Sequence, residues 1–237
     1  MDRPSRHEQD QLRQAHERVL ARIRDACARV GRDPSTVRLV AVSKTVPVER
    51  LQVAAAGGLT VFGENRVQEA EGKVGSVTGA RWHLVGPLQS NKVRRAVATF
   101  DVIETIDSLD LARRVDRIVA EERPGTRLPV LLQVNVDRDP AKAGFDSADL
   151  GLVIEELLAL PALEIGGLMT VGRQVDRIED SRSTFRALRK IGDHLRASHP
   201  RLGPELSMGM SDDFEIAIEE GATNVRVGRA LFGERPH

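Results

Sequence analysis

The sequence predicts an α/β protein built as one closed (β/α)8 barrel, also called a TIM barrel, with an extra helix at its N-terminus. From Val37 onward, short apolar or β-branched runs alternate with helical patterns. Eight such runs occur, which is the number of strands in a closed parallel barrel. A doubly wound open sheet would normally show a glycine-rich fingerprint after its first strand, and none is present. The predicted strands are Val37–Val42, Thr60–Phe62, Arg81–Val85, Val102–Glu104, Val130–Asn135, Glu164–Met169, Glu205–Ser207 and Asn224–Val227.

Helical spacing marks the segments before and between these runs. The first helix carries apolar residues at helical spacing and ends before Gly31, which provides a left-handed stop. Between later strands, Leu109–Val119 and Phe185–Leu195 have apolar side chains along one face. The strand-then-helix unit therefore repeats along the chain. The apolar residues of the first helix are Leu12, Ala15, Val19, Ile23, Cys27 and Val30.

Length and composition indicate one folded domain. At 237 residues the chain is long enough for a single large barrel. No long linker or low-complexity tract divides it, so the predicted domain spans residues 1–237. Residues 1–6 lie in a polar, charged stretch and are expected to be disordered. The 35 basic residues equal the 35 acidic ones, so a nucleic-acid partner is not expected.

The single cysteine and the polar N-terminus indicate the compartment. Cys27 stands alone, which rules out an internal disulfide and a cysteine-based zinc site, and no metal site is predicted. The stretch from Met1 to Asp10 lacks the apolar core of a signal peptide, and no later run is long enough to span a membrane. We therefore expect a cytoplasmic protein without a membrane partner.

Lys44 is the first candidate for chemistry. It stands two residues beyond the run Val37–Val42, at the strand end where barrels carry their active face. Desolvation there disfavours the charged ammonium, so that a neutral amine becomes available to attack a carbonyl and form an imine. Strand-end lysines also serve as phosphate or carboxylate contacts, or simply as solvated loop residues. Its position alone leaves these alternatives open.

A second group of candidates lies in the last two strand-to-helix units. Ser211 is expected to cap the helix that follows Glu205–Ser207, and the free N–H groups and hydroxyl there suit a phosphate. Capping without a ligand is the alternative. Arg226 lies on the last strand, and Gly228 permits close backbone approach to an anion.

Closure of the barrel would place the strand that leads to Lys44 beside the strand that contains Arg226. Barrels favour phosphate sites after strands seven and eight. An imine-forming amine and a phosphate cradle would then face each other across one pocket. A phosphorylated aldehyde fits this pair of groups.

Several sequence blocks resemble the pyridoxal phosphate homeostasis proteins, also called the proline synthetase co-transcribed family, which are related to the N-terminal barrel of alanine racemase. The match runs from about the first helix to the C-terminus, and together the blocks are highly specific. The resemblance implies a barrel that binds pyridoxal 5′-phosphate (PLP). The blocks are Ala41–Lys44, Phe62–Glu69, Trp82–Lys92, Gly167–Thr170, Leu206–Asp212 and Val225–Gly233.

The resemblance also implies a role for individual residues. Lys44 corresponds to the lysine that holds PLP as a Schiff base, and Arg226 to the residue that meets the pyridine nitrogen. Arg229 departs from the family pattern, which often carries Thr or Ser, so that a hydroxyl contact is lost while the backbone amide is retained. The implied phosphate contacts are Ser211, the amides of Gly228 and Arg229, and Ser207 as a further candidate.

Three more residues in the family blocks, Asn65, His83 and Met169, are expected to line the pocket near strand ends. Each of them alone is more often a packing or capping residue. His83 lies between Trp82 and Leu84 on a strand, where it is as well suited to orient neighbours as to act as a general base.

The residue types favour binding over catalysis. PLP enzymes that stabilise carbanions usually hold an acidic residue against the ring nitrogen, whereas Arg226 is a permanent cation. The related two-base racemases use a tyrosine from an extra β-domain, and this chain has no tyrosine. We therefore expect a PLP homeostasis protein without robust turnover. Its predicted partners are PLP and, by resemblance, PLP-dependent apo-enzymes, and the family implies a monomer.

Two catalytic alternatives stay open at this point. The first is a weak PLP-dependent amino-acid racemase or decarboxylase, which would use the same site and differ only in turnover. The second is a Schiff-base aldolase acting on a sugar phosphate, for which Glu64 and Glu104 are the candidate proton shuttles.

Overall fold

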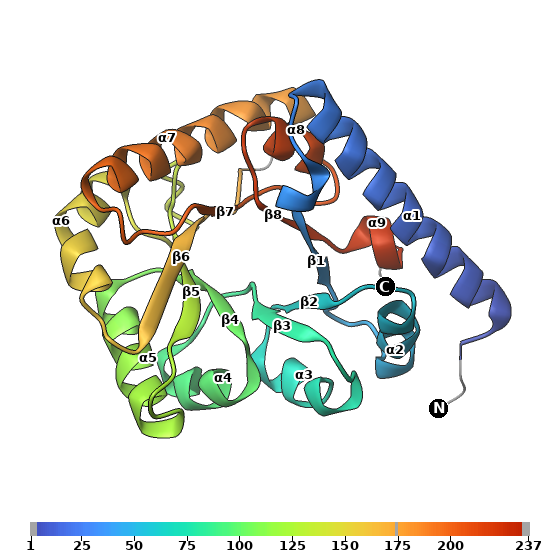
Figure 1. Cartoon of the computed structure of the whole chain (residues 1–237), viewed down its shortest axis with the longest axis horizontal. Coiled ribbons are helices and arrows are strands. Elements are labelled where there is room, and N and C mark those ends of the chain that lie inside the picture. The colour runs from blue at the N-terminus through green and yellow to red at the C-terminus, as the bar shows by residue number, and fades with distance from the viewer. Residues whose placement is uncertain (1–3, 174, 234–237) are drawn as a thin grey trace.

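The computed structural model describes residues 4–173 and 175–233. Its parallel strands close into one barrel in chain order, because β8 pairs with β1 (Figure 1). Each of the predicted strands overlaps one of these, so the predicted fold is confirmed. The strands are β1 Arg38–Val42, β2 Val61–Glu64, β3 Arg81–Leu84, β4 Val102–Ile106, β5 Leu128–Gln133, β6 Leu163–Met169, β7 Glu205–Ser207 and β8 Asn224–Val227.

Helices surround the ring of strands on the outside (Figure 1). The predicted helices Leu109–Val119 and Phe185–Leu195 lie within α5 and α7, which extend by one turn or less at their ends. Short 3-10 helices occur at Pro34–Thr36, Val74–Ser76, Ser90–Lys92 and Ile178–Ser181. The α-helices of the described ranges are α1 Arg6–Arg29, α2 Val48–Ala56, α3 Val67–Glu71, α4 Val93–Thr99, α5 Leu109–Glu122, α6 Ser147–Leu158, α7 Arg182–Ser198, α8 Phe214–Glu219 and α9 Arg229–Phe232.

The extra N-terminal helix α1 packs along α8, α9 and α2 on one side of the barrel (Figure 1). It begins with a capping box, in which the Ser5 hydroxyl accepts the Glu8 amide and the Glu8 carboxylate accepts the Ser5 amide. This start differs from the expected disorder of residues 1–6 at Ser5 and Arg6, because both belong to the capped first turn. Residues 1–3 lie outside the described residues.

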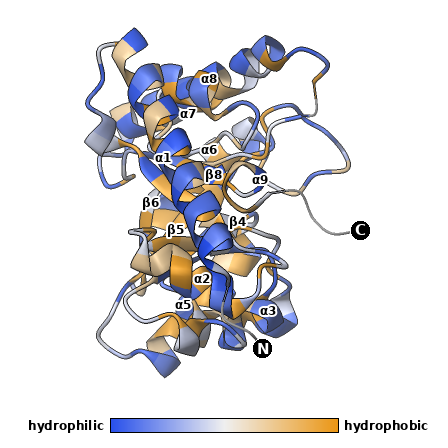
Figure 2. Ribbon diagram, turned by 90° about the vertical axis from the view of Figure 1, so that its right-hand side faces the viewer, coloured by the Kyte–Doolittle hydropathy of each residue, from blue (hydrophilic) through white to orange (hydrophobic). Residues whose placement is uncertain are grey.

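The hydrophobic core fills the space between the strands and the helices. Figure 2 shows this arrangement as apolar strands inside and a largely hydrophilic outer face on α1. The rings of Phe62 and Trp82 stack with centroids 5.3 Å apart, so β2 and β3 are joined by aromatic packing as well as by backbone pairing. Cys27 is buried in this core, as its place in the helical pattern predicted. No helix among the described residues is both long and apolar enough to cross a membrane.

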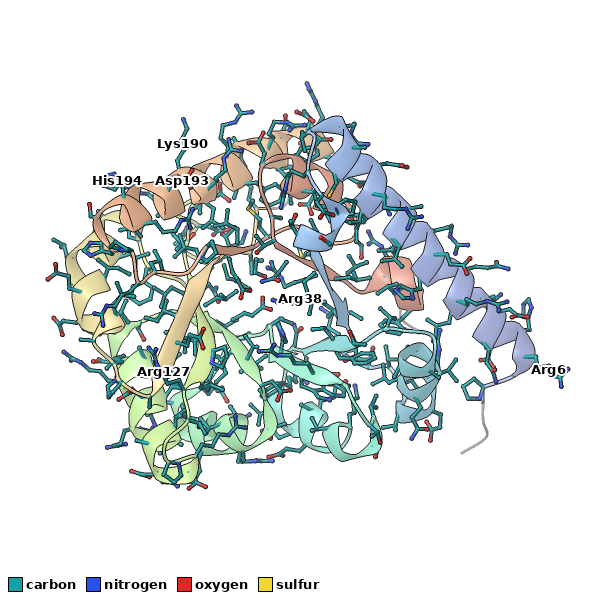
Figure 3. All side chains as sticks on the ribbon, in the orientation of Figure 1. Arg6, Arg38, Arg127, Lys190, Asp193 and His194 are labelled. Atoms are coloured by element: carbon teal, nitrogen blue, oxygen red, sulfur yellow. The ribbon has the colours of Figure 1, made fainter. Side chains whose placement is uncertain are left out.

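Different polar groups occupy the two ends of the barrel. At the amino end of the strands, Arg38 donates to Asn224 (3.0 Å) and to Glu205 (3.1 Å), which joins β1, β8 and β7. Figure 3 labels Arg38 near the middle of the ring of strands. The carboxyl end carries the candidate residues described below. Closure of the barrel fixes the register between its strands, and this register decides which side chains meet at the carboxyl end.

Gly167 on β6 is required by the close approach of β7. Its φ is +151°, and a Cβ would lie 2.0 Å from the carbonyl oxygen of Glu205. We expect Gly167→Ala to lower the unfolding free energy by at least about 3 kcal/mol, because the clash is with backbone that cannot swing away. Urea denaturation measures the loss.

Gly166→Ala is the matched control for this substitution. A Cβ at Gly166 would approach only side-chain atoms, of Leu131 at 3.3 Å and Glu205 at 3.4 Å, which can shift. We expect a loss of about 1 kcal/mol for this variant. Equal losses for the two variants would show that the β6–β7 contact is looser than the structure indicates.

Candidate functional site

The candidate site lies at the carboxyl end of the barrel, where β1 and β8 end side by side. Lys44 follows β1 and is half-buried. The register pairs Val40 of β1 with Arg226 of β8. Gly228 follows β8, and a Cβ there would lie 3.3 Å from the carbonyl oxygen of Val42. Barrel closure thus brings the Lys44 segment next to the segment of Arg226 and Gly228, as the sequence predicted.

Arg226 is almost fully buried and belongs to a chain of buried polar groups. Its guanidinium donates to the Ser207 hydroxyl (2.7 Å) and to the carbonyl oxygen of Thr170 (2.7 Å). The Ser207 hydroxyl donates in turn to Glu104 Oε2 (2.5 Å). The other carboxylate oxygen of Glu104 lies 2.6 Å from Nδ1 of His83. These hydrogen bonds connect β8, β7, β4 and β3.

The charges in this chain balance each other. Burial opposes ionisation of Glu104, but the hydrogen bond and attraction of His83 and the charge of Arg226 outweigh it, so the pKa of the Glu104 carboxyl is lowered. Burial lowers the pKa of the Arg226 guanidinium, while the charges of Glu104 and Asp213 oppose this shift. Arginine nevertheless stays protonated in proteins. Arg226 is therefore a buried cation that Glu104 compensates.

His83 orients the Glu104 carboxylate. An ionised carboxylate only accepts hydrogen bonds, so Nδ1 of His83 carries the hydrogen in their contact. Nε2 of His83 has no hydrogen-bond partner among the described residues, although the ring is only 1% exposed. Of the two roles that the strand position left open for His83, this geometry supports the orienting one.

Ser211 faces the start of the last helix, α9, and does not cap α8, the helix that follows it in the chain. The N-cap of α8 is Asp213, whose side chain accepts the backbone N–H of Met210 (2.7 Å). The Ser211 hydroxyl instead accepts the amides of Gly228 (3.3 Å) and Ala230 (3.4 Å). The predicted capping of α8 by Ser211 is therefore wrong, because the chain turns through residues 211–213 before α8 begins.

The hydroxyl of Ser211 and the two amides that converge on it form a group of donors suited to an anion. Arg229 is the residue that departs from the pattern of the family that the sequence resembles, and its guanidinium forms an ion pair with Asp212. Both side chains of this pair are largely exposed, so the pair lies at the surface beside the donors. Ser207 does not join this group, because its hydroxyl serves Arg226 and Glu104.

The other predicted pocket residues lie on neighbouring strands. Met169, at the end of β6, is fully buried and pairs in register with Ser207. Asn65 follows β2 and is half-buried. Its backbone is held close to Gly86, where a Cβ would lie 2.4 Å from the Asn65 carbonyl oxygen. All the predicted site residues thus lie on β1, β2, β3, β6, β7 and β8 or in the segments that follow these strands, with Arg229 at the start of α9.

The two carboxylates proposed as an aldolase proton shuttle belong to separate networks. Glu64 accepts the Ser43 hydroxyl (2.7 Å) and the ammonium of Lys73 (2.8 Å). Glu104 accepts from His83 and Ser207. No hydrogen bond joins the two carboxylates within the described part of the chain, which does not favour the aldolase hypothesis.

Sequence reasoning missed the partners of Arg226 and of the Lys44 segment. The sequence suggests Glu104 only as a proton shuttle, although a charged residue within the largely apolar run Val102–Ile106 is a signal for a buried, paired group. Thr170 contributes only its carbonyl oxygen, which no side-chain pattern can reveal. Lys73 gave no signal, because a lysine after a short helix is normally solvated.

Features far from this end do not add to the site. Figure 3 shows Lys190, Asp193 and His194 along the outer side of α7, away from the ring of strands. Across the described ranges, no cluster of three or more His, Cys, Asp or Glu side chains could hold a metal ion. The chemistry available at the carboxyl end is therefore that of an amine, a buried cation and a set of anion-binding donors.

Comparison with known proteins gives the family. Residues 16–236 match the model of the alanine racemase N-terminal domain. The chain is 43% identical over 225 residues to the pyridoxal phosphate homeostasis protein of Pseudomonas aeruginosa, with 93% of this chain and 94% of that protein covered. It is 40% identical over 222 residues to the protein of the same name from Aquifex aeolicus, at 93% and 96% coverage.

Solved structures agree with the sequence comparison. PipY of Synechococcus elongatus, whose structure was solved with PLP bound, is 41% identical with a TM-score of 0.79, and the match covers 89% of this chain and all of PipY (100%). Alanine racemase of Clostridium difficile is only 15% identical, with a TM-score of 0.76, and the match covers 96% of this chain and 60% of that enzyme. The racemase shows the barrel fold alone. Identity and coverage together place this chain in the pyridoxal phosphate homeostasis protein family.

Proposed function

We propose that this protein binds PLP as a Schiff base on Lys44 and acts in cytoplasmic PLP homeostasis without robust catalytic turnover. The observation that carries the proposal is the pairing of β1 with β8, which puts the Lys44 segment next to a buried, compensated arginine. Family membership supports it, because relatives bear that name and PipY was solved with PLP bound.

The residues at the carboxyl end match the three functional groups of PLP. The Lys44 amine would condense with the aldehyde, which is the step by which PLP becomes covalently held. Arg226 would donate to the pyridine nitrogen. The Ser211 hydroxyl and the amides of Gly228 and Arg229 would bind the phosphate, in the region where Ser211 now accepts N–H groups. Asn65, His83 and Met169 complete the proposed pocket, with Ser207 acting through Arg226.

The electrostatics of Arg226 favour binding without turnover. When bound, PLP supplies an electron sink whose strength depends on protonation of the ring nitrogen. A guanidinium in contact with that nitrogen opposes its protonation, and Glu104 keeps the guanidinium in place through Ser207. The sequence also has no tyrosine to serve as a second base. Both features reduce racemase or decarboxylase activity.

The test is to record the absorbance spectrum of the purified protein before and after borohydride, then to map the modified peptide by mass. A pyridoxyl adduct on Lys44, with no conversion of a panel of amino acids, is expected. An adduct accompanied by steady turnover would favour the racemase or decarboxylase alternative. A protein that forms no adduct after PLP is added would contradict both hypotheses.

The homeostatic role and the monomeric state can be tested separately. We expect the PLP-loaded protein to reactivate a PLP-dependent apo-enzyme, and light scattering to give the mass of one chain, 26.0 kDa. Failure to reactivate any of several apo-enzymes would argue for storage without transfer. A mass of two chains would contradict the predicted monomer.

A further inference from the structure

The chain leaves β1 through a strained turn at the proposed Schiff-base lysine. Thr45, directly after Lys44, has a φ of +64°. A β-branched residue rarely adopts this left-handed conformation, because its Cβ crowds the backbone. Such strain persists only where surrounding contacts hold it. The contacts that hold Thr45 are therefore candidates for a functional role.

Two side chains from the segment after β2 hold the backbone on both sides of Lys44. The Glu69 carboxylate accepts the backbone N–H of Thr45. The ammonium of Lys73 donates to the carbonyl oxygen of Ser43 (2.9 Å). Lys73 also donates to the same Glu69 oxygen (2.8 Å), so the two contacts form one clamp.

Lys73 is buried, and each of its three ammonium N–H donors has a hydrogen-bond acceptor. Its side chain is 9% exposed, and its three ammonium donors reach Ser43, Glu69 and Glu64. Glu64 is fully buried and also accepts the Ser43 hydroxyl. A lysine whose three donors are satisfied at one geometry has a defined position, unlike a solvated lysine on the surface.

We propose that Glu69 and Lys73 are positioning residues for Lys44: they clamp the backbone on both sides of it and hold the strained turn that sets the direction of its side chain. The inference rests on the proposed function, in which Lys44 forms the imine. Its contacts with the residues on either side of Lys44 are to backbone atoms, so in this proposal it acts by placing Lys44. Burial raises the pKa of Glu64, whereas Lys73 and the Thr45 amide lower that of Glu69 despite its burial, so the clamp contains a charged Glu69 at neutral pH.

Glu69→Ala is the decisive variant, because it removes the acceptor for Thr45 while Lys73 keeps Glu64 and Ser43. We expect the rate constant for formation of the borohydride-reducible adduct to fall at least tenfold. Glu69→Gln, which retains an acceptor oxygen for the Thr45 amide, is expected to recover most of the rate. Circular dichroism and thermal melting check that each variant is folded.

Glu71→Ala is the matched control on the same helix, α3. Glu71 forms an ion pair with Arg95 at the surface, and within the described residues its carboxylate has no hydrogen bond or ion pair with Glu69, Lys73 or Thr45. Its adduct should form at the wild-type rate. An equal loss in Glu71→Ala and Glu69→Ala, or a rate within twofold of wild type for Glu69→Ala, would overturn the proposal.

A double-mutant cycle tests whether Glu69 acts by holding Thr45 in its strained conformation. Glycine adopts a positive φ without a steric penalty. We therefore expect Glu69→Ala to slow adduct formation less in a Thr45→Gly background than in the wild type. The same tenfold loss in both backgrounds would contradict the role of the strained turn.

Hydrogen exchange of the ligand-free protein separates this proposal from the proposed function. The Thr45 amide should exchange faster in Glu69→Ala than in the wild type, because its hydrogen-bond acceptor is gone. In Glu71→Ala it should exchange at the wild-type rate. Wild-type protein that forms no adduct would contradict the Schiff base at Lys44. The exchange rate of the Thr45 amide would then be the test of the clamp. Unchanged exchange in Glu69→Ala would overturn the clamp even if the adduct forms.

Discussion

Lys44→Ala is expected to abolish the borohydride-reducible PLP adduct while changing the unfolding free energy by less than about 1 kcal/mol. Lys44 is half-buried in the turn after β1 and lies outside the hydrophobic core. Its removal takes away the only amine that the proposal uses for imine formation, without opening a core cavity. Intact-protein mass after reduction, together with urea denaturation, measures both quantities.

Lys190→Ala is the control for this prediction. Lys190 lies on the outer side of α7, far from the ring of strands (Figure 3), and its removal should leave the adduct and the stability unchanged. An adduct that persists in Lys44→Ala would assign the Schiff base to another lysine. An unfolded Lys44→Ala protein would show that Lys44 supports the barrel itself.

Most of the fold follows from periodicity, and the deviations have local causes. The predicted fifth strand begins at Val130, directly after Pro129, a residue that lacks an amide and seldom lies within a strand. The structure begins β5 at Leu128, and Pro129 pairs in register with Glu164. The predicted fourth strand ends at Glu104, before the polar Thr105, whereas β4 continues to Ile106. In both cases barrel closure overrides a local signal.

The candidate site also has a part that the sequence predicts and a part that it does not. Lys44, Arg226 and Gly228 were predictable, because strand ends and a closed barrel fix their neighbourhood. The bond from Ser207 to Glu104 joins residues 103 positions apart, and its existence depends on the register of several strands. The capping role of Ser211 failed because it depends on the path of a few loop residues. Contacts set by tertiary register, or by backbone atoms, leave no pattern in the sequence.

Glu104→Gln is expected to lower the unfolding free energy by about 3 kcal/mol or more at neutral pH, because removing the carboxylate leaves the buried charge of Arg226 without the group that compensates it. Glu104 is the carboxylate that faces both the Arg226–Ser207 link and His83. Ser207→Ala, which removes the link but keeps both charges, should cost about 1–2 kcal/mol. Urea denaturation at pH 7 ranks the two variants. A Glu104→Gln protein as stable as the wild type would show that Arg226 does not need this carboxylate.

Ionisation of Glu104 also predicts how the stability difference depends on pH. The folded protein lowers the pKa of Glu104, so this carboxylate contributes stability above its unfolded pKa of about 4.3, and the contribution is lost as the pH falls through the folded pKa. The difference in unfolding free energy between wild type and Glu104→Gln should therefore shrink as the pH falls below about 4.3. Comparing the two proteins cancels the opposite effects of Glu64 and Asp213, whose pKa values burial raises. A difference that grows towards acid would mean that Glu104 is protonated in the folded protein at neutral pH, and that Arg226 lies in the barrel without a counter-charge from β4.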